Sequence, residues 1–542
     1  MTYSFFTNPK KTPQTEPIPG RQAEMVQGRS GAWLFKAESW QQLRRCLLMG
    51  TASGSYYAGK QVLTQEFAEI LQQAVAADPD RVAQEITYAS DGHALNNSAP
   101  LLALVFLSLG DSPAAKAAFQ ATFPAVVRTA SHFYEWLGYS KSLRGFGKSV
   151  RLAGQQWLST PDVKTLAYQL LKYQQRQGFA HRDILRLFHV KPPSPDHDRL
   201  FQWACEGWET LPPGSPSPAL SQIWWYEWLK RNPAGTCRAI EQGRLTHEMV
   251  APIGEMTPDA WALLVEEMPI GALLRNLGSL TQLGVLGISP RRKGKKSKKN
   301  RLIERVDQVL TDRQHLRRGR IHPIDILKAL KTYRSGGKLG QSRKIWQPLP
   351  EITEILETAL DRAFEALPAT GQTFLHAVDI SGSMGYYTVG SMALTCCEIA
   401  ATMALASAKA EKNTIIRGFS TTFRDLGITQ QDSFASAMQK AMDNNFGGTD
   451  AAVAYEWAIK HKQWVDCFCF WTDCESWAGR QHPSQALAEY RRKINPKAKA
   501  VYITLVPDGF SLVDPQDPQS WDIAGFDPST PRLLQLIALG EI

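Results

Sequence analysis

The chain has 542 residues, with 61 Lys and Arg against 51 Asp and Glu, and 43% of its residues are apolar. This length predicts about two to four domains, and 21% charged residues with 16 tryptophans exclude a disordered or collagen-like chain. No apolar run reaches the ~18 residues of a membrane span. Residues 1–20 lack an apolar signal core, which predicts a cytoplasmic protein. The eight cysteines lack the paired spacing of a zinc site and are expected to be reduced thiols.

The net charge of +10 is divided unevenly along the chain. Residues 370–542 carry 14 basic and 18 acidic residues, whereas residues 1–369 carry 47 basic and 33 acidic residues. A basic part joined to an acidic part favours polyanion binding in the basic part.

Residues 37–367 show helical periodicity interrupted by Pro and Gly. Over 161–178 the apolar residues share one helical face, with Thr160 as the expected N-cap and Gly178 as the expected stop. A second helix start is expected at Thr257. Many medium-length helices predict an α-solenoid of stacked helix pairs. Because no fixed period is visible, a plain α-helical bundle remains an alternative.

One segment of the helical part differs from the rest. Residues 291–301 read RRKGKKSKKNR, which is eight basic residues in eleven without an apolar one. This composition predicts a basic loop that binds phosphates, and a solvated loop without a ligand is the alternative.

After Pro368 apolar strands alternate with helices. We expect strands at 374–380, 414–419, 466–472 and 500–506, and helices at 391–409 and 484–494. Near-continuous apolar strands between helices indicate a doubly wound α/β domain, in which ligands bind at the carboxyl ends of the strands.

Hydroxyl and carboxyl side chains gather at these strand ends. The first strand runs into Asp379, Ser381 and Ser383, the third strand ends before Asp473, and Thr449 precedes a further helix. Hard oxygen ligands of this kind suit Mg²⁺, and neutral hydroxyls leave the ion positive enough to take an incoming carboxylate. The alternative is that Asp379 and Ser381 only cap a helix.

The three loops together resemble the von Willebrand factor A domain and its metal-ion-dependent adhesion site (MIDAS). The resemblance implies that Ser381, Ser383 and Thr449 ligate Mg²⁺, with Asp379 and Asp473 acting directly or through water. It also implies an acidic protein ligand at the metal.

Basic residues occupy three consecutive predicted faces between residues 142 and 191. Their spacing can follow a run of phosphates, although each face alone is as well explained by solvation. The residues are Arg144, Lys148 and Arg151 on the first face, Lys172 and Arg176 on the second, and Arg182, Arg186 and His189 on the third.

Four stretches of the helical part resemble the TROVE module of the Ro autoantigen family. They read LRGFGKSVRLAGQQWL, LAYQLLKYQQRQGFAHRDILRLFHVKP, MPIGALLRNLG and RGRIHPIDILKALKTYRSG. In that family a von Willebrand A domain follows the module, as it does here. We therefore expect a flexible segment over 1–27, a TROVE-like helical repeat domain over 28–367 and an A-like domain over 368–542.

The resemblance implies a ring of irregular, HEAT-like repeats closed by the A domain. It implies that single-stranded 3′ ends of misfolded RNA enter a central hole, that small Y-type RNA binds the outer surface, and that an exoribonuclease of the polynucleotide phosphorylase type is a partner. By motif, Lys148, Arg151, Arg176, His181, Arg182 and Arg186 are expected RNA contacts. Arg275, Asn276, Arg320 and His322 lie in the other matching motifs, where a structural role is equally open. We expect a monomer.

No catalytic set is visible in the sequence. Phosphate-binding GxxxxGK[ST] and zinc-binding HExxH motifs are absent, and one ion held by hydroxyls fits ligand capture better than hydrolysis. The leading hypothesis is a non-catalytic RNA-binding protein. A metal-dependent adhesion or chaperone-accessory scaffold and a Mg²⁺-dependent nuclease are the alternatives.

Overall fold

The computed structural model describes residues 11–50, 60–208, 217–287, 301–337, 345–364, 368–386, 394–444, 446–506, 508–525 and 527–541. The predicted basic loop lies outside these residues except for Arg301, which begins helix α16. Within the described residues, no helix combines the length and the apolarity that crossing a membrane requires.

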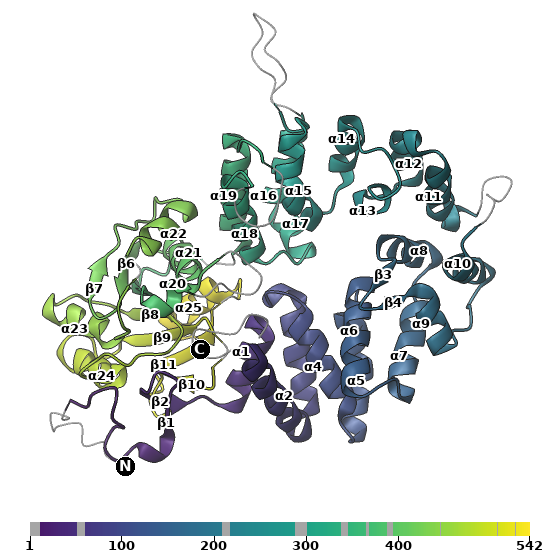
Figure 1. Ribbon diagram of the computed structural model, residues 1–542. Helices are drawn as coiled ribbons and strands as arrows, with labels where there is room; N and C mark the ends of the chain where they lie inside the picture. The colour runs from purple at the N-terminus through teal and green to yellow at the C-terminus, as the bar shows by residue number, and fades with distance from the viewer. Residues whose placement is uncertain are drawn as a thin grey trace, which may run out of the picture.

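The first two thirds of the chain are helical, and neighbouring helices along the chain pack on one another (Figure 1). The first helices are α1 (Ser39–Met49), α2 (Lys60–Ala77), α3 (Pro79–Tyr88), α4 (Ser98–Leu109), α5 (Pro113–Val126), α6 (Ala130–Leu143), α7 (Lys148–Ser159), α8 (Val163–Lys172), α9 (His181–Phe188) and α10 (Pro195–Glu206). They are followed by α11 (Ser221–Arg231), α12 (Thr236–Gly243), α13 (His247–Val250), α14 (Pro258–Glu267), α15 (Ile270–Gln282), α16 (Arg301–Thr311), α17 (Arg313–Arg318), α18 (Pro323–Arg334) and α19 (Pro350–Ala363).

Local sequence explains where several of these helices begin. Thr257 caps α14 as predicted, because its side chain accepts a hydrogen bond from the Ala260 amide. The predicted cap of α8 was wrong: Asp162 accepts from the Thr165 amide, and Thr160 instead ends α7. Gly178, at φ +77°, lies in the turn between the short strands β3 (Gln175–Arg176) and β4 (Phe179–Ala180) rather than at a helix end.

The last third of the chain forms the predicted α/β domain. Its elements are β5 (Thr373–Asp379), α20 (Gly382–Tyr386), α21 (Cys396–Lys409), β6 (Asn413–Phe419), β7 (Phe423–Asp425), α22 (Phe434–Met442), α23 (Ala452–Lys460), β8 (Cys467–Thr472), α24 (Pro483–Lys493), β9 (Lys499–Thr504), β10 (Phe510–Ser511), β11 (Ser520–Ala524) and α25 (Thr530–Leu539). The six-stranded sheet has the order β11-β9-β8-β5-β6-β7 and is parallel except for β7.

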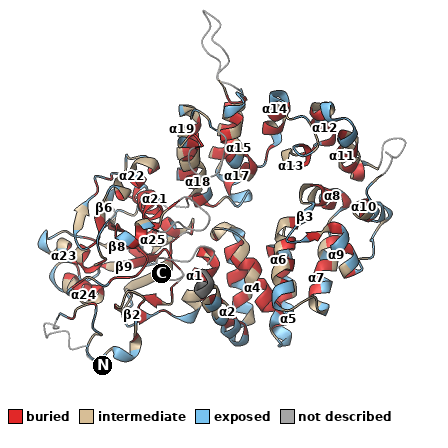
Figure 2. Ribbon diagram, in the orientation of Figure 1, coloured by how far each residue is buried: buried red, intermediate tan, exposed pale blue. Residues whose placement is uncertain are grey.

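Both faces of this sheet are covered. Phe468 and Phe470 of β8 point into one apolar cluster with residues of α23 and α24, whereas Cys467, Cys469 and Trp471 belong to a second cluster with residues of α21 and α25. Buried positions accordingly run through the central strands as well as through the helices (Figure 2). The alternation confirms the doubly wound arrangement.

The expectation of a flexible segment over residues 1–27 does not hold for residues 11–27. Strand β1 (Met25–Gln27) pairs with β2 (Trp33–Lys36), which pairs with β10 of the α/β domain. Gln14 is almost fully buried, and its side chain bonds to Asp450 and to Ser476. The polar, Pro-rich composition of this segment did not predict its ordered structure, because its polar side chains bond to residues of the distant C-terminal part.

The helical arc begins and ends at the α/β domain (Figure 1), which confirms the predicted ring-like arrangement. At its start, α1 packs against β11, and the buried Arg45 donates to the carbonyls of Asp508 (2.7 Å) and Phe510 (2.9 Å) and pairs with Asp522. At its end, Lys331 of α18 pairs with Glu398 of α21 at 2.6 Å.

Replacing Arg45 by Ala should strongly destabilise the contact between the two parts. The substitution leaves the buried carboxylate of Asp522 without its partner, and breaking such a pair costs about 3–5 kcal/mol. Arg244→Ala is the control, because Arg244 and its partner Glu267 are both more than half exposed and such an ion pair is worth at most about 1 kcal/mol. Calorimetric Tm values of the full chain measure both losses, and equal shifts in the two variants would contradict the assigned role.

Candidate functional site: a metal-binding loop cluster and exposed basic helices

The predicted metal-site residues come together at the carboxyl ends of β5 and β8. The chain passes from β5 to β6 on one side and from β8 to β9 on the other, so these ends form the topological switch point of the sheet. All five residues are buried, from Asp379 at 0% exposure to Ser383 at 9%. The complete set is Asp379, Ser381, Ser383, Thr449 and Asp473.

Backbone hydrogen bonds hold the three loops against one another. The Gly382 amide donates to the Gly447 carbonyl at 3.1 Å, and the amides of Trp477 and Ala478 both donate to the Thr449 carbonyl at 2.9 Å. Gly447 has φ +91°, a conformation that favours glycine. The loops therefore form one connected cradle rather than three independent turns.

Side-chain contacts order the first loop. The two carboxylate oxygens of Asp379 accept from the Ser381 amide at 2.9 Å and from the Thr472 hydroxyl at 2.7 Å. The hydroxyls of Ser381 and Ser383 lie 3.1 Å apart. Both serine oxygens are thus presented together beside the carboxylate.

Burial raises the pKa of both carboxylates in the cradle. Burial raises the pKa of Asp379 to about 6, although hydrogen bonds from Ser381 and Thr472 oppose the shift. Burial and then the charge of Asp379 raise the pKa of Asp473 well above its usual range. Two carboxylates placed this way repel each other unless a positive charge lies between them or a proton neutralises one.

The residues fit a Mg²⁺ ion. The buried Thr449 hydroxyl has no hydrogen-bond partner among the described residues, which is a feature that a metal ligand explains. Ser381, Ser383 and Thr449 would supply neutral oxygens and Asp379 and Asp473 the charge, in keeping with the preference of Mg²⁺ for hard oxygen ligands. A bound ion would supply an electrophilic position for a carboxylate.

Six predicted RNA contacts are exposed on consecutive elements of the helical part. Helices α7 and α9 pack closely, since a Cβ on Gly154 would come within 2.5 Å of the Phe188 ring. Arg182 and Arg186 share the opposite, solvent-exposed side of α9 and both lie near Cys205 of α10. The exposed residues are Lys148, Arg151, Arg176, Arg182, Arg186 and His189.

Three other predicted contacts serve the fold instead. His181 is buried, with Tyr134 at 2.5 Å from Nδ1 and the Leu170 carbonyl at 2.9 Å from Nε2. His322 is buried and caps α18 by accepting from the Ile324 amide. Arg144 caps α6 and donates to the Ser108 carbonyl and hydroxyl. These three side chains thus make contacts within the fold, and their contact with RNA stays a prediction.

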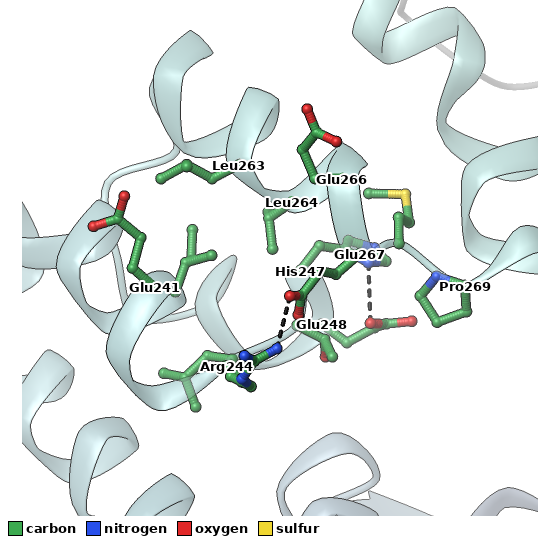
Figure 3. A pocket seen from close by; sticks show the side chains of 13 residues that line it. Glu241, Arg244, His247, Glu248, Leu263, Leu264, Glu266, Glu267 and Pro269 are labelled. Carbon is green, nitrogen blue, oxygen red and sulfur yellow. Dashed lines mark hydrogen bonds and ion pairs between the residues drawn. The ribbon is translucent and has the colours of Figure 1, made fainter. Parts of the chain in front are cut away.

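Lys172 lies beside a pocket of about 300 Å³ between α12, α13 and α14, because it pairs with the lining residue Glu248 (Figure 3). It is half-buried and lies 3.5 Å from Glu248, which also pairs with His247 at 3.0 Å. Although burial opposes the shift, His247 and Lys172 lower the pKa of Glu248 to about 2. Arg244 pairs with Glu267 on the rim at 2.7 Å. The charge of Lys172 is thus used inside the protein.

A second group of cations lies where the two ends of the arc meet. Arg320 pairs with Asp91 at 2.8 Å, and a Cβ on Gly92 would lie 3.4 Å from the Arg320 Cα atom. Burial and then the charge of Arg320 lower the pKa of the neighbouring Arg128 to about 10. Arg275 is exposed on α15, whereas Asn276 bonds to a carbonyl of its own helix.

Sequence reasoning overlooked the exposed cations of α17. Arg313, Arg317 and Arg318 all face solvent, next to Arg320. The dense basic run RQHLRRGR at residues 313–320 is the available signal, and only its last three residues fall within a stretch that resembles the family.

A ring of helical repeats joined to an α/β domain defines the class of TROVE and von Willebrand A proteins. The TROVE domain family matches residues 26–207 and 245–354, and the Ro60 vWA domain family matches residues 373–538. The chain belongs to the Ro60 family.

Two curated relatives carry the description RNA-binding protein RO60. The protein from Deinococcus radiodurans is 32% identical over 99% of this chain and 98% of its own length, and the one from Caenorhabditis elegans is 27% identical over 95% and 90%. The crystal structure of the Deinococcus radiodurans RO (RSR) protein is similar, with a TM-score of 0.67 at 30% identity, covering 93% of this chain and all of that one.

The buried His181 should make the helical part sensitive to acid. Burial lowers its pKa to about 4, from 6.5, so the folded chain keeps it neutral while the unfolded chain protonates it. The stabilisation is therefore complete above pH 6.5 and is lost as the pH falls toward 4, by up to about 1.4 kcal/mol per pH unit. Calorimetric Tm values between pH 6.5 and 5 should fall less steeply for His181→Gln than for the wild type. The exposed His189→Asn is the control, and an unchanged slope in His181→Gln would contradict the prediction.

Proposed function

We propose that the chain is a non-catalytic, cytoplasmic RNA-binding protein that acts as a monomer in RNA quality control. It binds small Y-type RNA on its basic outer surface and single-stranded 3′ ends of misfolded RNA inside the ring, and it works with an exoribonuclease of the polynucleotide phosphorylase type. Membership of the Ro60 family supports the RNA-binding part of this proposal.

The observation that carries the proposal is the exposure of five lysine and arginine side chains on α7, β3 and α9, with the exposed His189 at the end of α9. Lysine and arginine side chains at solvent-exposed helix positions can neutralise successive phosphates without disturbing the core. The acidic balance of residues 370–542 supports the proposal that the helical part binds the RNA.

We further propose that the α/β domain binds Mg²⁺ through the cradle described above and takes an acidic side chain of a partner protein at the ion. The buried Thr449 hydroxyl and the two buried carboxylates support this role. Holding one ion by hydroxyls favours ligand capture over hydrolysis.

The double variant Arg182→Ala with Arg186→Ala should weaken RNA binding and flatten its salt dependence. Each lost phosphate contact lowers the slope of log K against log salt by about 0.7 for single strands and 0.9 for duplexes. The matched control is Lys460→Ala with Lys497→Ala, which removes the same charge from exposed positions of the α/β domain. Fluorescence anisotropy with a labelled RNA between 50 and 200 mM salt measures the slopes. Equal losses in the two double variants would show that only net charge matters.

The variant Ser381→Ala with Ser383→Ala should lose Mg²⁺ affinity and keep its affinity for RNA, because the cations lie on other elements. Calorimetric Mg²⁺ titration and RNA anisotropy on the same folded preparation separate the two effects. A large loss of RNA affinity would contradict the separation. Cleavage of labelled RNA by the wild type with Mg²⁺, absent in Asp379→Ala, would instead support a nuclease.

A further inference from the structure

Two exposed aromatic side chains flank the metal cradle. Phe446 is 45% exposed and directly precedes Gly447, and Trp477 is 39% exposed and follows Asp473 on the third loop. The Phe446 amide donates to the Ile380 carbonyl at 2.8 Å, and the Trp477 amide donates to the Thr449 carbonyl at 2.9 Å. Both aromatic residues are thus tied by their backbones to the loops that carry the proposed ligands.

Both rings are held in place by their neighbours. The Trp477 ring lies against Gly448, where a Cβ would come within 2.8 Å of the indole. The Arg424 guanidinium lies 4.1 Å from the centroid of the Phe446 ring, which is the geometry of a cation–π contact. Aromatic side chains that stay exposed although they are fixed lose little entropy on binding, and Trp and Arg are enriched in the energetic centres of protein interfaces.

We propose that Phe446, Trp477 and Arg424 form an aromatic rim that selects the partner at the metal. The rim binds a protein segment in which the acidic residue that reaches the ion is followed by an aromatic or branched apolar residue. This inference rests on the proposed metal site and adds the specificity of its ligand.

The electrostatics of the domain favour a protein segment over RNA. Residues 370–542 have four more acidic than basic residues, and Asp379 and Asp473 lie in the cradle itself. A single divalent ion compensates one incoming carboxylate, whereas an RNA strand brings one further negative charge with every nucleotide. Bases could also stack on Trp477 and Phe446, so RNA is the competing outcome of the test.

The test uses the full chain and two fluorescein-labelled hexapeptides, one with a central Asp followed by Phe and one with the same Asp followed by Ser. In fluorescence polarisation with Mg²⁺ we expect the Asp-Phe peptide to bind about tenfold more tightly than the Asp-Ser peptide. EDTA should abolish both signals. Trp477→Ala and Phe446→Ala should each bring the affinity for the Asp-Phe peptide close to that for the Asp-Ser peptide.

The matched control is Trp464→Ala, because Trp464 is 51% exposed and precedes the opposite, amino end of β8. It should leave the discrimination unchanged. Since Trp477→Ala could loosen the cradle, its Mg²⁺ affinity is measured by calorimetry, and Phe446→Ala provides the second reading.

Three results would overturn the proposal. The first is that neither peptide binds, or that both bind equally, while calorimetry shows Mg²⁺ bound. The second is that Trp477→Ala weakens binding of a labelled single-stranded RNA and leaves peptide binding unchanged, which would assign the rim to RNA. The third is that the wild type binds no Mg²⁺, which would remove the proposed metal site together with its rim and leave RNA binding by the helical part untouched.

Discussion

The α/β domain is organised around two carboxylates that are buried next to each other at the carboxyl ends of β5 and β8. Burying the charged form of these carboxylates costs free energy. Hydrogen bonds from Ser381 and Thr472 to Asp379 offset only part of that cost, since the pKa of Asp379 is still raised. Buried carboxylates with strongly raised pKa values are typical of functional sites. The strand order, which reverses between β5 and β8, puts the pair where the sheet opens toward solvent.

In the helical part, tertiary packing separates the basic residues whose charge is used within the fold from those that stay exposed. Arg45, Arg144 and Lys172 each have carbonyl or carboxylate partners inside the protein, so their charges are used within the fold. Arg182 and Arg186 remain exposed on α9 and can take an external anion. A positive charge contributes to polyanion binding only if the protein leaves it in contact with solvent, and this depends on tertiary packing.

Sequence patterns predicted the elements of the α/β domain well because buried parallel strands are apolar over their whole length. The strand expected at 466–472 is β8 (Cys467–Thr472), and the helix expected at 484–494 is α24 (Pro483–Lys493). The residues predicted to ligate Mg²⁺ do come together at one edge of the sheet, because each follows a strand or precedes a helix, and their binding of the ion stays a prediction. The environment of polar residues was harder to predict: His181 and His322 lie in family motifs, yet long-range packing buries them. The order of residues 11–27 was missed for the same reason, since the partners of Gln14 lie more than 400 residues away.

The turn between β1 and β2 near the N-terminus contacts both the α/β domain and the helical part. Glu475, two residues after Asp473, accepts hydrogen bonds from the amides of Arg29 and Ser30, at 2.8 and 3.2 Å. The Arg29 guanidinium continues to Glu66 of α2 at 2.9 Å and to the buried Asp508 at 3.1 Å. The third loop of the metal cradle is therefore connected to the first helices of the ring by charged, largely buried contacts. A ligand shifts a conformational equilibrium only if it binds the two conformations with different affinity. Binding at the cradle could therefore affect the helices through these contacts only if loop 473–478 had two conformations. The backbone bonds from Trp477 and Ala478 to Thr449 hold that loop in one arrangement, so the structure favours a rigid cradle whose ligand preference is built in before binding.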